Sequence, residues 1–208
     1  MSNLARLYDD LAETYAAGRH LFDTTPILKA FAGQLPANAH VLDAGCGAGE
    51  PVARTFIERG DTVIGIDVSE SMLNLARQRV PEATFQRMDL RALDFAPESF
   101  DAVVAVYVVF HLPRVEHAAL FAGVARVLKP GGALLLTLAT RAYTGQDEFD
   151  GEMEFLGRAL PYSHDRPETA LHKLERAGLT MVSAQLIETG GETFYWVMAR
   201  KPPAACER

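Results

Sequence analysis

The stretch VLDAGCGAGEP, residues 41–51, decides the fold. Its apolar first half predicts a buried strand, and glycines at alternate positions predict a tight turn into a helix over 50–59. Similar apolar runs, TVIGID (62–67) and ALLLTLA (133–139), recur downstream with helical patterns between them. Strands that alternate with helices are typical of right-handed βαβ units, so the sequence predicts a parallel sheet covered by helices.

The two ends of this core have other patterns. Residues 1–36 predict two helices ahead of the sheet, and residues 141–165 are polar and aromatic with a short helical stretch inside. That second segment interrupts the alternation, and we expect it to be a lid or substrate segment. The strands expected over 179–188 and 193–200 are joined by a Gly-Gly sequence, which predicts an antiparallel hairpin.

These patterns together define the expected fold class. We expect an α/β protein with a Rossmann-like, doubly wound, mostly parallel seven-stranded sheet that ends in an antiparallel C-terminal hairpin strand. The length of 208 residues suits one domain, expected over 1–201, with a tail over 202–208.

Composition excludes several classes of protein. With 49% hydrophobic residues the chain can form a core, and 20 basic against 27 acidic residues give a net charge of −7, which disfavours nucleic acid as a partner. The apolar runs are too short to span a bilayer, and the first residues lack the pattern of a secretory signal. Because there are only two cysteines, Cys46 and Cys206, we expect a cytoplasmic protein without a disulfide framework or a metal site.

Acidic side chains follow the expected strands at the edge where such sheets bind ligands. Asp67 ends the second strand, where a carboxylate can accept both hydroxyls of a ribose; a helix cap is the alternative. Asp89 follows the third strand, where a carboxylate can accept from an adenine amine; a solvated turn is the alternative. Met72 suits either an adenine face or core packing of its helix.

The spacing of the glycines separates two kinds of cofactor. A dinucleotide site has the pattern G-x-G-x-x-G, which lets a helix N-terminus face the pyrophosphate. This chain has D-x-G-x-G-x-G from Asp43 to Gly49, with Glu50 directly after it. A carboxylate there opposes phosphate, so the turn favours a ligand with an amino acid end.

The sequence resembles a known family at this point. It is similar to the class I S-adenosylmethionine-dependent methyltransferases, of the small soluble type related to the ubiquinone and menaquinone methyltransferases. The resemblance covers about residues 8–140, through YDDLAETY (8–15), VLDAGCGAGE (41–50), VIGIDVSESML (63–73), MDL (88–90), FDAVVAVYVVFHL (100–112) and RVLKPGGALLL (126–136).

The resemblance implies S-adenosylmethionine as the cofactor and assigns residues to it. The glycine turn would surround the methionine end, Asp67 would hold the ribose, and Asp89 with Leu90 would bind the adenine edge. A tyrosine of the first helix, Tyr8 or Tyr15, would contact the sulfonium. The full set of expected cofactor-binding residues is Tyr15, Asp43, Gly45, Cys46, Gly47, Asp67, Val68, Met72, Asp89, Leu90 and Val106.

Two histidines are the candidate catalytic bases. His111 follows the fourth expected strand at the rim of the site, and His164 lies in the interrupting segment. Each also suits a structural role, and His20 is a weaker candidate. Cys46 is rejected as a nucleophile because no base is adjacent to it.

The acceptor is expected to be a small molecule, apolar or aromatic, and the protein to be a monomer or homodimer. Aromatic residues over 141–164, with Tyr195 and Trp196, favour an apolar acceptor, whereas the acidic run from Asp147 to Glu154 suits a solvated face or a cationic acceptor. Two other functions stay open: a regulatory or cyclase-like protein that binds the cofactor without methyl transfer, and a nicotinamide-dependent oxidoreductase. The glycine spacing disfavours the oxidoreductase.

Overall fold

The computed structural model describes residues 3–18 and 21–204. The helices are α1 Asn3–Gly18, α2 Thr25–Ala32, α3 Val52–Arg59, α4 Glu70–Arg79, α5 His117–Val127, α6 Arg141–Thr144 and α7 Pro167–Arg176, with short 3-10 helices η2 Val109–His111 and η3 Arg114–Glu116. The strands are β1 His40–Ala44, β2 Thr62–Asp67, β3 Thr84–Arg87, β4 Phe100–Ala105, β5 Leu128–Leu138, β6 Phe149–Phe155, β7 Arg158–His164, β8 Thr180–Thr189 and β9 Glu192–Arg200.

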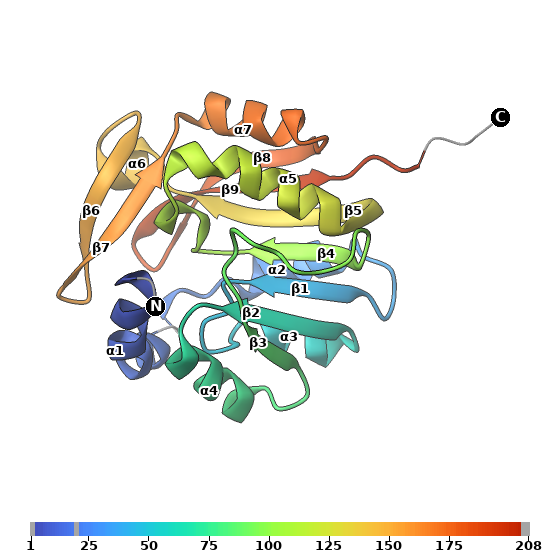
Figure 1. Ribbon diagram of the computed structural model, residues 1–208, viewed down its shortest axis with the longest axis horizontal. Coiled ribbons are helices and arrows are strands. Elements are labelled where there is room, and N and C mark those ends of the chain that lie inside the picture. The colour runs from blue at the N-terminus through green and yellow to red at the C-terminus, as the bar shows by residue number, and fades with distance from the viewer. Residues whose placement is uncertain (1–2, 19–20, 205–208) are drawn as a thin grey trace.

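A seven-stranded sheet forms the centre of the molecule (Figure 1). Its strand order is β3-β2-β1-β4-β5-β9-β8. Neighbours from β3 to β5 pair in parallel, and β9 runs antiparallel to both β5 and β8. The order reverses at β1 and β4, so their carboxyl ends form the place where open α/β sheets bind ligands. The expected fold class is confirmed.

Both faces of the central strands β1, β4 and β5 are largely buried, which explains why these strands are apolar runs without polar alternation. Val41 of β1 belongs to one hydrophobic cluster with Phe31 of α2 and Phe56 of α3. Its neighbour Leu42 belongs to a second cluster with Phe121 of α5. Successive strand residues point to opposite faces, so β1 contributes to both clusters.

Two strand boundaries differ from expectation. The apolar run FDAVVAVYVVFH (100–111) predicts the fourth strand over 102–107, but the strand ends at Ala105, because Tyr107 adopts φ +58° and leaves the extended conformation. The fifth strand was expected to begin after Pro130-Gly131-Gly132 but begins at Leu128. A shift of register between Phe100 and Ala102 of β4 accommodates the extra residues.

The interrupting segment is a hairpin that the sequence reading missed. The expected short helix is α6, but β6 and β7 follow it as a separate two-stranded antiparallel sheet. Apolar and acidic residues do alternate along β6, FDGEMEF, which is the strand signal. The turn hid it: Leu156 and Gly157 have φ values of +51° and +72°, and leucine is an unusual residue for such a turn.

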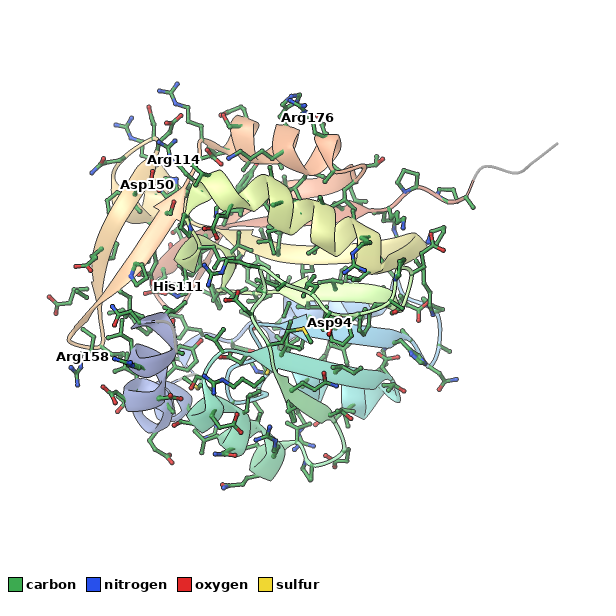
Figure 2. The ribbon with its side chains drawn as sticks, in the orientation of Figure 1. Asp94, His111, Arg114, Asp150, Arg158 and Arg176 are labelled. Atoms are coloured by element: carbon green, nitrogen blue, oxygen red, sulfur yellow. The ribbon has the colours of Figure 1, made fainter. Side chains whose placement is uncertain are left out.

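The base of the hairpin is fixed by ion pairs centred on Arg114. Its Nε donates to Asp150 Oδ2 over 2.6 Å and its Nη1 to Glu148 Oε2 over 2.5 Å. Figure 2 shows Arg114 and Asp150 together where the hairpin meets the main body. Much of the acidic run is therefore paired with arginine, because Asp147 also lies within ion-pair distance of Arg141 and Arg166.

The other end of the hairpin reaches α1 (Figure 1). Phe155 of β6 lies with its ring centroid 6.0 Å from that of Tyr15. Within the residues that the structure describes, no helix is long and apolar enough to cross a membrane. The single domain over 1–201 and the lid role of 141–165 stay predictions, and Cys206 and His20 lie outside the described residues.

Candidate cofactor and acceptor site

The glycine turn after β1 is held against β2 by its backbone. The amides of Gly45 and Cys46 both donate to the carbonyl of Ile66, over 2.8 and 2.9 Å. Gly45 has φ +78°, and a Cβ there would lie 2.5 Å from Cγ2 of Val108. The turn therefore requires glycine at this position for conformation and for space.

Asp67 ties the end of β2 to this turn. Its Oδ2 accepts from the Gly47 amide over 3.0 Å, and its Oδ1 accepts from the Ser69 amide over 2.9 Å. Each carboxylate oxygen has a second lone pair, so both can still accept from a ligand. Burial raises the pKa of Asp67 above its ordinary value, although these hydrogen bonds oppose the shift.

Asp89 is in a more open position, at the end of β3. Arg91 donates to it in a bidentate manner, with Nη2 2.6 Å from Oδ2. The hydrogen bond from Arg91 holds the pKa of Asp89 below its ordinary value, so this carboxylate is charged at neutral pH. Leu90, next to it, is buried.

Two adjoining cavities lie along these strand ends. Seven of the expected cofactor residues line the first cavity: Tyr15 of α1, Gly45, Gly47, Asp67, Val68, Met72 and Val106. The other, of about 360 Å³, shares Gly45, Asp67 and Val68 and adds Asp89 and Leu90. We call this pair the cofactor cavity.

The residues of the cofactor cavity fit S-adenosylmethionine. The space above the glycine turn is open to a ligand, because a Cβ on Gly47 would meet nothing nearer than the Tyr15 ring, 3.8 Å away. Asp67 offers two acceptors for the two ribose hydroxyls. Met72 is fully buried in α4 and packs with Ala12 and Ala16 of α1, as core packing predicts; it also lines the cavity, and its contact with adenine stays a prediction.

Three expected site residues do not line these cavities. Asp43 is buried beneath the turn, and the Cys46 thiol lies near the Gly47 carbonyl in the core. Burial raises the pKa of Cys46 well above its ordinary value, which agrees with its rejection as a nucleophile. His164 is buried on β7, where its Nε2 accepts from Thr144 Oγ1 over 2.8 Å. The structure therefore separates His164 from the cofactor cavity.

A further cavity, of about 350 Å³, adjoins the cofactor cavity. We call it the aromatic chamber. It shares four residues with the cofactor cavity, Tyr8, Tyr15, Tyr107 and His111. Its other lining residues are Phe22, Phe110, Phe155, Tyr162, Glu192 and Phe194.

His111 stands where the two cavities meet, between α1 and the hairpin (Figure 2). Its Nδ1 lies 2.8 Å from the carbonyl oxygen of Pro161, which can only accept, so Nδ1 carries the proton. In the neutral ring Nε2 is then an acceptor, and the Tyr8 hydroxyl donates to it over 2.7 Å. These bonds join α1, η2 and β7 at one point.

Some side chains that line the chamber were not predicted from the sequence as candidates for binding an acceptor. Tyr107 is the clearest, because its positive φ turns its ring into the chamber and a non-glycine residue adopts that conformation only where its surroundings fix it. Phe194 and Trp196 share one face of β9, whereas Tyr195 lies by a groove elsewhere. Tyr195 and Trp196, both expected near the acceptor, thus lie on opposite faces of β9, because successive side chains of a strand alternate.

The buried imidazole predicts a pH effect on stability. Burial lowers the pKa of His111 from 6.5 to about 4. Between these values the unfolded chain binds a proton that the folded chain does not, so stability falls as the pH drops. We expect this group to remove about 2 kcal/mol from the free energy of unfolding between pH 7 and pH 5.

Urea unfolding at both pH values measures this effect in the wild type and in His111→Gln. Between pH 7 and pH 5 the free energy of unfolding of the variant should fall by about 2 kcal/mol less than that of the wild type. The difference reports His111 alone, because His117 and the other titrating groups are common to both proteins. An equal loss in the two proteins would mean that His111 is protonated in the folded state at pH 5.

Comparisons with known proteins agree with this geometry. Residues 41–132 match the family model described as a methyltransferase domain. Methyltransferase GfsG of Streptomyces halstedii is 37% identical over 168 residues, which cover 74% of this chain and 59% of that protein. The 27-O-demethylrifamycin SV methyltransferase of Amycolatopsis mediterranei is 37% identical over 121 residues, which cover 54% and 44%.

A solved structure of an S-adenosylmethionine-dependent methyltransferase from Mesorhizobium loti has the same fold. Its TM-score is 0.69 at 24% identity, over 84% of this chain and 96% of that chain. Part of the chain is therefore similar to methyltransferase domains, and its fold is that of the S-adenosylmethionine-dependent methyltransferase structure, in agreement with the resemblance seen in the sequence. It spans about half the length of the two curated relatives that it matches.

Proposed function

We propose that the protein is an enzyme that uses S-adenosylmethionine to methylate a small-molecule acceptor. One observation carries the proposal: the cofactor cavity, with Asp67 at its centre, joins a second cavity across Tyr8, Tyr15, Tyr107 and His111. A methyl donor and its acceptor need two such adjoining spaces. Cytoplasmic location and the state of monomer or homodimer stay predictions.

The proposed roles divide between the two cavities. Gly45, Gly47 and Asp67 bind the cofactor at its methionine and ribose ends, and Asp89 with Leu90 binds the adenine edge. When bound, the cofactor supplies a methyl group on a sulfonium, which a nucleophile takes by in-line displacement while the electron pair of the broken bond stays with sulfur. The chamber holds the acceptor and excludes water from it.

His111 has a positioning role in this proposal. Both of its nitrogens are engaged, and its lowered pKa makes it a weak base at neutral pH. It orients the Tyr8 hydroxyl at the junction of the two cavities. Direct base catalysis by His111, and any catalytic role of His164, stay predictions.

Calorimetric titration with S-adenosylhomocysteine and, in parallel, with NADH tests the proposal. We expect micromolar binding of S-adenosylhomocysteine alone. Binding of NADH alone would replace the proposal with the oxidoreductase alternative, which the glycine spacing disfavours. Binding of neither would overturn the cofactor assignment.

Methyl transfer itself needs a separate test, because a regulatory or cyclase-like protein would bind the same cofactor. Incubation with methyl-labelled S-adenosylmethionine and a broad panel of small acceptors should give a labelled product. Cofactor binding with no transfer to any acceptor class would favour the alternative without methyl transfer.

A further inference from the structure

The charged and aromatic side chains of the aromatic chamber favour one sign of ligand charge. Among the described residues that line it, Glu192 at the start of β9 is the one side chain with a formal charge at neutral pH, since buried His111 is neutral. The remaining lining side chains are those of tyrosines and phenylalanines. Its field is therefore negative.

The Glu192 carboxylate acts on several rings of the site. Its Oε1 accepts from the Tyr143 hydroxyl over 3.4 Å. Burial raises the pKa values of Tyr8 and Tyr162, and the charge of Glu192 adds to both shifts. The influence of this carboxylate thus extends across the chamber, from β9 to α1 and β7.

The aromatic walls add to the same field, because the face of each ring is negative. Tyr107 makes T-shaped contacts with Phe194, Trp196 and Phe22, with centroids 5.0, 5.9 and 6.5 Å apart, whereas Phe110 stacks on Tyr162 and Phe194. A cation against such a face is stabilised, the more so when water is excluded. An anion in the same place is destabilised by the faces and by Glu192.

This pattern distinguishes between classes of nucleophile. A hydroxyl acceptor must lose its proton, and the imidazole at the junction is engaged at both nitrogens. An amine acceptor enters the chamber as its free base, its proton having gone to bulk water outside. Its lone pair forms the new carbon–nitrogen bond, and the positive charge passes from sulfur to nitrogen, where the chamber stabilises it.

We propose that the aromatic chamber recognises a small organic amine, whose nitrogen is held as a cation between the ring faces and Glu192. This inference rests on the proposed function and names the acceptor class for it. It replaces the neutral apolar acceptor expected from the aromatic content alone, and it assigns the attraction of a cation to Glu192 rather than to the largely paired acidic run of the hairpin.

Two probes of nearly the same shape test the charge directly. Calorimetry at neutral pH compares 2-phenylethylammonium with 2-phenylethanol, with and without saturating S-adenosylhomocysteine. We expect the ammonium to bind about tenfold more tightly or better. Glu192→Gln should remove most of that preference while leaving the affinity for S-adenosylhomocysteine unchanged.

Glu188→Gln is the matched control. It removes the same charge from exposed β8, four residues away and outside the chamber, and should keep the wild-type preference. Equal affinity for the two probes, tighter binding of the alcohol, or no binding of either would overturn the amine inference. If S-adenosylhomocysteine still binds, the proposed function survives that result; if it does not bind, the proposed function fails separately.

Discussion

Replacing Asp67 by alanine is expected to weaken the binding of S-adenosylhomocysteine by about 10- to 150-fold. The ribose would lose a charged acceptor, a change of about 1.5–3 kcal/mol. The Gly47 and Ser69 amides would also lose their acceptor, so the turn itself would be held less firmly. Calorimetric titration of the folded variant gives the affinity.

Two variants control for side effects. Asp94→Ala removes the same side chain from an exposed position outside the cofactor cavity and should bind as the wild type does. Asp67→Asn keeps one oxygen acceptor, so its affinity for S-adenosylhomocysteine should lie between those of the wild type and Asp67→Ala. An Asp67→Ala protein that folds and binds with unchanged affinity would refute the ribose assignment.

Gly45→Ala is expected to lower the free energy of unfolding by about 2–5 kcal/mol. Two penalties combine: an L-residue at φ +78° costs about 1–2 kcal/mol, and the new methyl group would overlap Val108, which costs about 1–3 kcal/mol. Because Val108 and Gly45 both line the cofactor cavity, the shift should also abolish binding of S-adenosylhomocysteine. Urea unfolding and calorimetry measure the two effects.

Gly60→Ala separates the two penalties. Gly60 ends α3 at φ +93°, but a Cβ there would meet nothing within 4 Å, so only the conformational cost applies. A second check is the double variant Gly45→Ala with Val108→Gly, which removes the Cβ and both methyl groups of Val108 that the new side chain would overlap. If Gly45→Ala cost no more than Gly60→Ala, close packing of the turn against Val108 would not be the reason for glycine.

Local patterns explain why the main sheet was predictable. The strands of a doubly wound sheet are short apolar runs, and the helices between them have stripes and glycine ends, as at Gly60 after α3. The hairpin β6–β7 was missed because its turn, Leu156-Gly157, lacks the usual residues. Its ion pairs with Arg114 join residues more than thirty positions apart, which no local pattern reveals.

The cofactor site was predictable because consecutive strand ends meet at one edge of the sheet. Chain order alone therefore brings Gly45, Asp67 and Asp89 together. No comparable rule predicts from chain order which residues line the aromatic chamber. Tyr8, Tyr107, Tyr162 and Glu192 come from α1, the loop after β4, the hairpin and the last strand, and their meeting depends on how these elements pack.

The sequence by itself determined the fold class, and it predicted a ligand site at the strand ends and the kind of cofactor, because each depends on short-range patterns and on chain order. Only the tertiary structure decided the surroundings of individual side chains. It buried His164 away from the cavities, engaged both nitrogens of His111 and enclosed Glu192 among aromatic rings. Burial, charge and hydrogen-bond partners arise from contacts between distant segments, so the chemistry of the acceptor site could be read only from the folded molecule.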